Sequence, residues 1–217
     1  MKIEILFEDE NYIAVNKPAP LLVHRTPGDK DTINLLKLVK EQTGHYLYPI
    51  HRLDKQVSGV IIFGLNPQAV RDLQSHWHSD KIQKKYKALV KGNIEKSGTH
   101  NFALHDEKKI PKDAITHYTP IDSFERATLV DIRIETGRYH QIRRHFSRRM
   151  QHIIGDRRYG KKINNDYFKD NYGLMRMFLH SYELRIKIEE LNLDLTLKAP
   201  LANDLQEVLN KINSISC

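Results

Sequence analysis

The chain has 217 residues, with 35 Lys and Arg against 27 Asp and Glu, which gives a net charge of +8 besides 12 histidines. This length can bury a sizeable core in one globular unit, and 40% apolar residues exclude general disorder. Such a positive surface favours partners that carry phosphates. The single cysteine, Cys217, excludes an intrachain disulfide and argues against a Cys-based zinc site.

The N-terminal segment does not have the pattern of a signal peptide. Glu4 and Glu8 interrupt the stretch that would have to be apolar, and the longest apolar run, at 60–63, is far shorter than a bilayer span. Together with the cysteine usage, this predicts a cytoplasmic protein with no membrane partner.

The first quarter of the chain predicts a hairpin, a helix and a buried strand. Residues 3–7 and 12–16 are short strand-like runs separated by an acidic turn. Thr32 is expected to cap a helix that ends at Gly44. The apolar, β-branched run at 59–65 predicts a strand that is covered on both faces.

A second helix and a half-exposed strand are expected next. Asn66 and Pro67 have the pattern of an N-cap followed by a proline at the first helical position, and this helix is expected to reach about Lys81. Residues 84–92 alternate between polar and apolar side chains, which is typical of a strand. The polar segment 93–113 is expected to be a surface loop or a connection between lobes.

The middle of the chain predicts two strands, at 114–121 and 127–135, followed by a helix from Arg138. Helical spacing would place one apolar stripe against the core, made of Tyr139, Ile142 and Phe146.

The last part predicts two more strands, at 178–187 and 192–198, and a final helix. Asn203 and Gln206 have the spacing of a capping box at the start of that helix. Because strands and helices are interspersed without regular βαβ alternation, the sequence predicts an α+β fold with a mixed, mainly antiparallel sheet.

One carboxylate, Asp54, lies among cations at the edge of a predicted strand, in the sequence HRLDKQVSGVIIFG at 51–64. Taken alone, Arg52 and Asp54 would most simply be a surface ion pair worth about 0–1 kcal/mol. An arginine within reach lowers the pKa of an aspartate by about 1–3 units, and Arg52 and Arg143 are the candidates to keep Asp54 ionised.

Two basic segments follow. The sequence TGRYHQIRRH at 136–145 concentrates arginines and histidines with no acid among them. Tyr86 stands between Lys85 and Lys87, so it is either a half-buried strand aromatic or a platform on which an unstacked base lies while its phosphates meet the lysines. The basic residues expected to contact RNA are His51, Arg52, Lys85, Arg138, His140 and Arg144.

Four of these segments occur in an order that resembles one known family. HRLDKQVSGV, KKYKALVKG, TGRYHQIRRH and HIIGDRRYG together resemble the RluA-type pseudouridine synthases, and the resemblance runs from about residue 3 to about residue 200. The flanking sequences NKPAPLLVHR and MFLHSYEL are similar to those of a branch of that family that modifies tRNA.

The resemblance implies a fold with two lobes and a central catalytic cleft, and an enzyme that uses neither a cofactor nor a metal. Residues 1–217 are expected to be a single catalytic domain without an N-terminal S4-type module. We expect this domain to act as a monomer on an RNA substrate.

The resemblance also assigns roles to individual residues. Asp54 falls on the catalytic aspartate of the family and Tyr86 on its active-site tyrosine. Arg143 falls on the arginine that pairs with the aspartate, and Arg52 on the arginine that fills the gap left by a flipped uridine.

The expected activity is the isomerisation of uridine to pseudouridine in tRNA, at uridine 65. A ribosomal RNA uridine is the alternative substrate, because the same motifs serve either RNA. A non-catalytic RNA-binding protein would also explain the charge, and it predicts that Asp54 is dispensable. A hydrolase with an aspartyl nucleophile would usually need a second carboxylate for acid–base work, and the sequence shows no obvious one.

Overall fold

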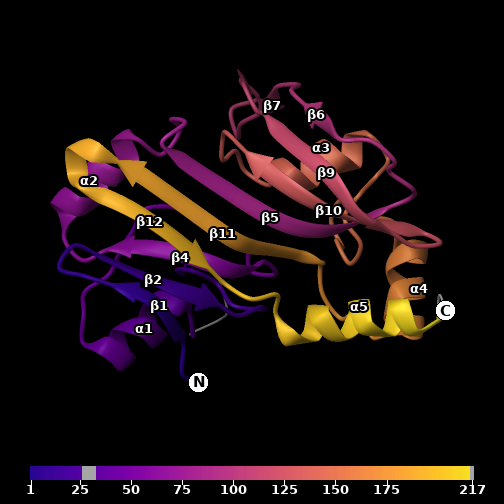
Figure 1. The fold of residues 1–217 in the computed structure, drawn as a ribbon, viewed down its shortest axis with the longest axis horizontal. Helices are drawn as coiled ribbons and strands as arrows, with labels where there is room; N and C mark the ends of the chain where they lie inside the picture. Colours follow the sequence, from indigo (N-terminus) through magenta and orange to yellow (C-terminus); the bar gives the residue numbers. More distant parts are fainter. Residues whose placement is uncertain (26–32, 216–217) are drawn as a thin grey trace. The chain divides into compact units, whose positions relative to one another are not determined.

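The computed structural model describes residues 1–25 and 33–215, and it confirms the α+β class with mainly antiparallel strands (Figure 1). The chain forms two compact units, which are described here one at a time. Unit 1 comprises Met1–Gln83 and Ser181–Pro200, and unit 2 comprises Lys84–His180 and Leu201–Cys217.

Unit 1 contains a sheet in the order β1-β2-β4-β11, with β12 paired to β11 and β3 paired to β4. Its strands are β1 (Glu4–Glu8), β2 (Tyr12–Lys17), β3 (Tyr48–Pro49), β4 (Ser58–Gly64), most of β11 (Leu179–Ile188) and β12 (Leu193–Lys198). Its helices are α1 (Leu35–Thr43), α2 (Pro67–Ser75) and the short 3-10 helix η1 (Glu189–Leu191). The predicted N-terminal hairpin is confirmed by the antiparallel pairing of β1 with β2.

Helix α2 covers one face of this sheet. Tyr12 and Ala14 of β2 lie in one apolar cluster with Val60 and Ile62 of β4 and with Leu73 of α2. The Tyr12 hydroxyl donates a hydrogen bond of 3.1 Å to the carbonyl oxygen of Ala69, which fixes the helix on the strand. Because side chains alternate between the two faces of a strand, every second residue of β2 and β4 faces α2 and holds it on the sheet.

The helix ends in unit 1 differ in part from those predicted. Asn34 caps α1 by accepting a hydrogen bond from the Lys37 N–H, whereas Thr32 lies outside the described residues. Asn66 caps α2 as predicted, but α2 ends at Ser75 and not near Lys81. Beyond Ser75 the chain continues in a series of turns, and these bring Trp77 into the apolar cluster beneath α2.

Gly59 allows β4 to approach β11 very closely. Its φ is +112°, and a Cβ at this position would lie 2.0 Å from the carbonyl oxygen of Ser181. Both the backbone conformation and the space therefore require glycine, five residues after Asp54.

Unit 2 contains a second antiparallel arrangement, in the order β5-β10-β9-β6, and a small separate hairpin of β7 and β8. Its strands are β5 (Ile82–Lys91, of which the first two residues belong to unit 1), β6 (Gly98–His100), β7 (Leu104–His105), β8 (Pro111–Lys112), β9 (Thr116–Ser123) and β10 (Ala127–Ile134). Its helices are α3 (Gln141–Arg148), α4 (Lys162–Tyr172) and α5 (Asn203–Ile215).

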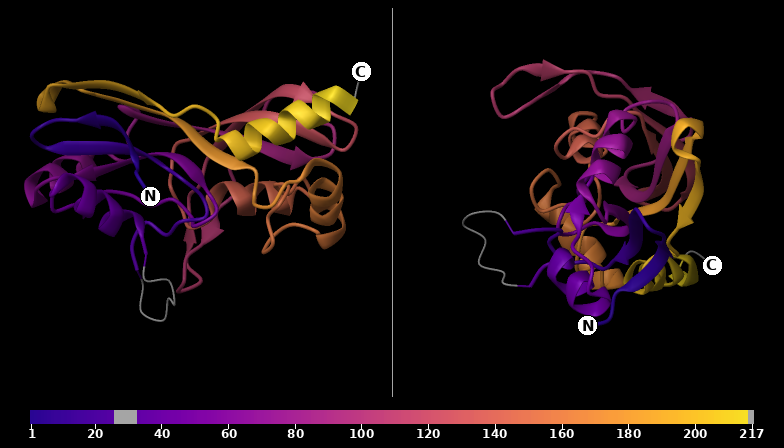
Figure 2. Two further views of the ribbon diagram at one scale, coloured as in Figure 1. Left: turned by 90° about the horizontal axis from the view of Figure 1, so that it is seen from below. Right: turned by 90° about the vertical axis from the view of Figure 1, so that its left-hand side faces the viewer.

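The two faces of the unit 2 strands carry different helices. Tyr86 of β5 pairs with Ile132 of β10, which pairs with Tyr118 of β9, so these side chains share one face. Helix α3 covers that face, with the Phe146 ring 5.4 Å from the Tyr118 ring. Leu89 lies on the opposite face, in an apolar cluster with residues of α4 and α5, two helices that contact each other (Figures 1 and 2).

Three predictions for unit 2 need correction. Helix α3 begins at Gln141 because His140 adopts a left-handed conformation, so Tyr139 precedes the helix and is 46% exposed, not part of the inward stripe. Ile142 and Phe146 are buried as predicted. At the start of α5, the Gln206 side chain donates forward to Asn210 and does not close a capping box with Asn203.

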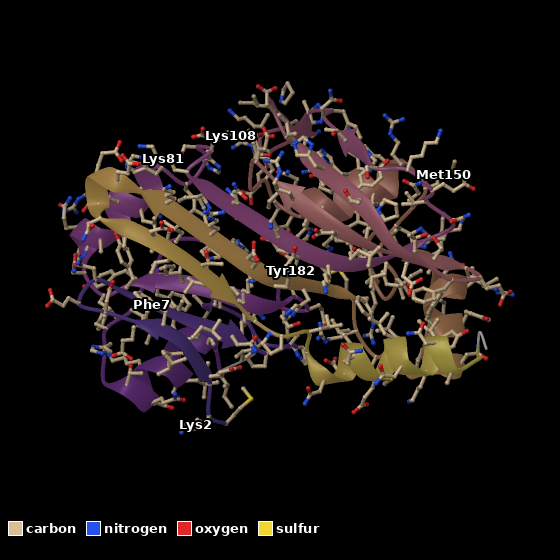
Figure 3. All side chains as sticks on the ribbon, in the orientation of Figure 1. Lys2, Phe7, Lys81, Lys108, Met150 and Tyr182 are labelled. Carbon is tan, nitrogen blue, oxygen red and sulfur yellow. The ribbon has the colours of Figure 1, made fainter. Side chains whose placement is uncertain are left out.

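Segment 93–113 was expected to be a surface loop or a connection between lobes, but it contains three short strands, and Lys108, labelled in Figure 3, lies in the turn of the β7–β8 hairpin. Helix α4 was not predicted at all. Among the helices of the described residues, none is long and apolar enough to cross a membrane.

A buried histidine pair lies between α3 and β6. His100 and His145 have ring centroids 5.9 Å apart, and the Phe102 and Phe146 rings contact them. The His145 ring is hydrogen bonded to the Thr116 hydroxyl and the Phe102 carbonyl oxygen. Burial, followed by neighbouring positive charges, lowers the pKa of each histidine to about 4.

This pair predicts a loss of stability in mild acid. The unfolded chain takes up these two protons near pH 6.5, whereas the folded chain resists them down to about pH 4, so their stabilisation is complete above pH 6.5 and is lost as the pH falls to 4. These two protons should contribute up to about 2.7 kcal/mol per pH unit to the fall in the free energy of unfolding in this window. Urea unfolding between pH 7 and 4 measures the slope, and His100→Phe should lower it by up to about 1.4 kcal/mol per pH unit; an unchanged slope would contradict the assignment.

Candidate functional site

Asp54 lies on a short loop of unit 1 whose backbone is held in place from both sides. Leu53 and Val57 are buried, and the Val57 N–H donates 3.0 Å to the Asp54 carbonyl oxygen, which closes a β-turn that begins at Asp54. The Asp54 side chain is half-buried and that of Arg52 is exposed. The loop therefore presents a carboxylate from a fixed backbone at the start of β4.

A buried lysine connects this loop to the end of β2. Lys17 is 0% exposed, and its ammonium donates to the carbonyl oxygens of Leu21 (2.7 Å), Pro18 (3.0 Å) and Lys55 (3.4 Å). The Leu21 N–H also donates 3.0 Å to Lys55, the residue after Asp54. Sequence reasoning did not select Lys17, because lysines are mostly exposed and its partners are backbone oxygens that no side chain reveals.

Replacing Lys17 by methionine should loosen this connection. Methionine fills the space but leaves buried carbonyl oxygens without their donor, so the free energy of unfolding should fall by about 2 kcal/mol. The turnover number should fall with it, because the Asp54 loop loses its tether. Urea unfolding and a turnover assay test this, with Lys37→Met, on the exposed side of α1, as the control that should change neither.

His51, expected to contact RNA, also has a packing role. Its Nε2 accepts a hydrogen bond of 3.2 Å from the Ile62 N–H, and its ring stacks on Trp77 at 4.5 Å. Because Nε2 accepts this hydrogen bond, the proton of the neutral ring lies on Nδ1. Any contact with RNA would have to come from the rest of this half-buried ring.

In unit 2, Tyr86 lies within the face covered by α3. It is 8% exposed, so its ring is not an open stacking platform. Lys84 lies on the same face at 4% exposure, and burial lowers its pKa to about 8. Lys85 lies on the opposite face of β5, because side chains alternate along a strand.

The turn before α3 is organised by one buried glutamine. The Gln141 side chain accepts hydrogen bonds from the Thr136 hydroxyl (2.7 Å) and the Arg138 N–H (3.0 Å), and it donates 2.9 Å to the Ile115 carbonyl oxygen. The Arg138 guanidinium in turn donates 3.0 Å to the Asp113 carbonyl oxygen. The basic turn is therefore tied to β9 before the helix begins.

Arg143 is held by a buried carboxylate that sequence reasoning missed. Its Nε and Nη2 donate to the two oxygens of Asp156 at 2.8 and 3.0 Å, and Asp156 also accepts the N–H groups of Arg158 and Tyr159. Burial alone would raise the pKa of Asp156, but the Arg143 hydrogen bonds and charge and these two N–H groups lower it below its ordinary value. The available signal was the acid of HIIGDRRYG, the only one in residues 136–161.

The predicted site residues thus fall into two sets. His51, Arg52 and Asp54 share the loop of unit 1. In unit 2, Arg138, His140, Arg143 and Arg144 surround the start of α3, the helix that covers the Tyr86 face, and the Arg144 guanidinium donates 3.4 Å to the Tyr139 carbonyl oxygen. Within residues 1–25 and 33–215, no three His, Cys, Asp or Glu side chains are grouped so as to hold a metal ion.

The described residues thus offer a carboxylate on a fixed loop and arginines around one helix start, groups that suit catalysis on a polyanion. The sequence profile of RNA pseudouridylate synthases matches residues 11–148, which include Asp54, Tyr86 and Arg143. The chain belongs to this family, and its activity is that of an isomerase acting on uridine in RNA.

Curated relatives agree with this membership, and a solved structure agrees with the fold. The chain is 32% identical to a tRNA pseudouridine synthase C of Vibrio parahaemolyticus, over 97% of this chain and 95% of that protein, and 31% identical to that of Vibrio cholerae, over 96% and 95%. Its fold is similar to that of human RNA Pseudouridylate Synthase Domain Containing 4, with a TM-score of 0.79 at 23% identity over 97% of this chain and 93% of that one.

Proposed function

We propose that this protein converts uridine to pseudouridine in tRNA, at uridine 65. The observation that carries the proposal is the similarity over nearly the full length of both chains to proteins named tRNA pseudouridine synthase C. Position 65 is proposed because the flanking sequences NKPAPLLVHR and MFLHSYEL resemble the tRNA-modifying branch. A ribosomal RNA uridine is the competing substrate.

The reaction breaks one bond to uracil and makes another, without adding or removing atoms overall. The bond between ribose C1′ and uracil N1 breaks, the detached ring rotates, and C1′ joins to C5. The proton on C5 leaves and N1 gains one. Because the ring is detached midway, the site has to hold it and exclude water.

Asp54 is the proposed catalytic group. A carboxylate can attack ribose C1′, attack C6 of the ring, or assist removal of the 2′ proton, and each route needs it ionised and fixed in direction. The β-turn that begins at Asp54 and the Lys17 tether supply the fixed direction. Tyr86 is proposed to accept the C5 proton, and the fixed guanidinium of Arg143 to supply positive charge.

The basic residues are proposed to bind the RNA while the target base leaves its stack. Extrusion of one base costs a few kcal/mol, which phosphate contacts and stacking must offset. Arg52, Arg138, His140 and Arg144 are the proposed contacts, and RNA affinity should decline steeply with salt because each phosphate contact releases counterions.

The test is release of tritium from C5-labelled uridine in bulk tRNA and, separately, in ribosomal RNA. We expect release from tRNA, and none from a transcript in which uridine 65 is replaced by cytidine. Release from ribosomal RNA alone would overturn the tRNA assignment but keep the reaction. Release from the cytidine transcript would overturn position 65, and RNA binding without any release would overturn the enzymatic role.

A further inference from the structure

Next to the Arg143–Asp156 pair, two aromatic rings form a stack that is open to solvent. The Tyr139 and His140 ring centroids are 3.7 Å apart and nearly parallel, at 24°. Tyr139 is 46% exposed, which is unusual for a large aromatic beside a buried helix start. The stack lies at the N-terminal end of α3, whereas Met150, labelled in Figure 3, lies two residues past the C-terminal end of that helix.

The stack is held in one orientation. His140 has the left-handed backbone conformation, with φ of 52°, and its Nδ1 is hydrogen bonded to the Tyr159 hydroxyl at 3.1 Å. The Arg158 guanidinium donates 3.1 Å to the Tyr139 hydroxyl. Both Arg158 and Tyr159 donate backbone N–H groups to Asp156, the carboxylate that holds Arg143. One buried acid therefore positions both Arg143 and the two side chains that fix the rings.

The charges around the stack are almost all positive. Residues 136–161 contain a single acid, Asp156, and it is 1% exposed and occupied by Arg143 and two N–H groups. The cations of the same segment are Arg138, Arg143, Arg144, Arg148, Arg149, Arg157, Arg158 and Lys161. An exposed ring with arginines at its edge suits a nucleobase on the ring and its phosphate on the arginines.

We propose that Tyr139, backed by His140 and aligned by Arg158, is a stacking site for one unpaired base of the RNA strand that carries the target uridine. This inference deepens the proposed function and rests on it for the identity of the RNA. When the target nucleotide is extruded, each flanking base loses it as a stacking partner, and Tyr139 takes its place beside one of these bases. The exposed arginines Arg157 and Arg158 hold the adjoining phosphates.

The first experiment needs no turnover. A short single-stranded RNA with one 2-aminopurine is titrated with the wild-type protein, because stacking quenches the fluorescence of that base. Tyr139→Ala should lose the quenching and weaken binding by about tenfold, as expected for one stacked base. Tyr139→Phe should retain both, since it keeps the ring. Tyr46→Ala is the matched control, because Tyr46 is likewise an exposed tyrosine, at 63%, with a cation beside it, here a lysine, but it lies in unit 1.

A second experiment locates the stacked base. Once the modified uridine is mapped with the wild-type protein, transcripts with one abasic nucleotide on either side of it are bound to wild type and to Tyr139→Leu, which keeps apolar bulk without a ring. At one position the abasic change should weaken wild-type binding about tenfold and the variant not at all.

The outcomes separate this inference from the proposed function. Unchanged quenching in both Tyr139→Ala and Tyr139→Leu, or equal losses at every abasic position, would overturn the stacking site even if tritium is released from tRNA. If Tyr139→Ala loses the quenching and the wild type releases no tritium from any RNA, the stacking site is supported and the proposed function is overturned. Circular dichroism of each variant identifies a change that merely unfolds the protein, and Tyr139→Phe against Tyr139→Leu then decides.

Discussion

Asp54→Asn is expected to lower turnover by a factor on the order of 10⁴ or more, because asparagine keeps the shape of the side chain but is neither a nucleophile nor a base. The free energy of unfolding should change far less than turnover, since the Asp54 carbonyl oxygen that accepts from the Val57 N–H and closes the turn is kept. RNA affinity should also be largely retained. Tritium release, RNA titration and urea unfolding measure the three quantities on one preparation.

The control for this substitution is Asp194→Asn, an exposed carboxylate on β12 of the same unit, which should change none of the three. Full turnover in Asp54→Asn would exclude the aspartate as the catalytic group. The sequence also predicts that Arg143 pairs with Asp54. If the two act together, adding Arg143→Lys to Asp54→Asn should cause little further loss, whereas independent effects would multiply.

Asp156→Asn is expected to have the largest effect on stability. Arg143 is largely buried and donates to both oxygens of Asp156, so an amide would place one N–H₂ group against an arginine donor and remove the negative charge that these two bonds meet. Loss of one partner of a buried pair destabilises by about 3 kcal/mol or more. Turnover should fall as well, because Arg143 loses its fixed direction.

The matched control is Asp204→Asn. Asp204 holds Arg176, whose side chain is 5% exposed, through the same two-bond arrangement at 2.6 and 2.9 Å. The Asp204 side chain is 55% exposed, so water can take its place at the guanidinium and the loss should be the smaller. Equal losses in urea unfolding would contradict the argument from burial. The pair also has a pH signature. Because the folded pKa of Asp156 is lowered, its stabilisation is present above the ordinary aspartate range and is lost as the pH falls through the folded pKa, a step that Asp156→Asn should lack.

Most of the strands and the Asp54 loop could be predicted from local pattern. Alternating and β-branched runs located β2, β4, β5 and β10, and Asn66-Pro67 located the start of α2 to the residue. These features depend on neighbours in sequence, so they are visible without the fold. The assignment of Asp54, Tyr86 and Arg143 came from several motifs in the right order and not from any one of them.

The rest depended on contacts between distant parts of the chain. Helical spacing placed Tyr139 in the core, but the left-handed His140 delays the helix until Gln141. Asp156 is the only acid in residues 136–161, but which of the arginines it binds depends on the fold, and the partner, Arg143, lies 13 residues earlier. Lys17 reads as a surface charge until the carbonyl oxygens of Leu21 and Lys55 are seen around it.

The division of the chain between the two units has a consequence for its synthesis. Strands β5, β10, β9 and β6 are all complete once residue 134 has been made, so the sheet of unit 2 can pair while the chain is still growing. Unit 1 starts first but has to wait, because β11 and β12 are among the last segments to emerge. Until then the edge of β4 that β11 will cover is exposed on the nascent chain. The sheet that carries Asp54 is therefore completed after the sheet of unit 2, and truncation before residue 181 should leave unit 1 without two of its strands.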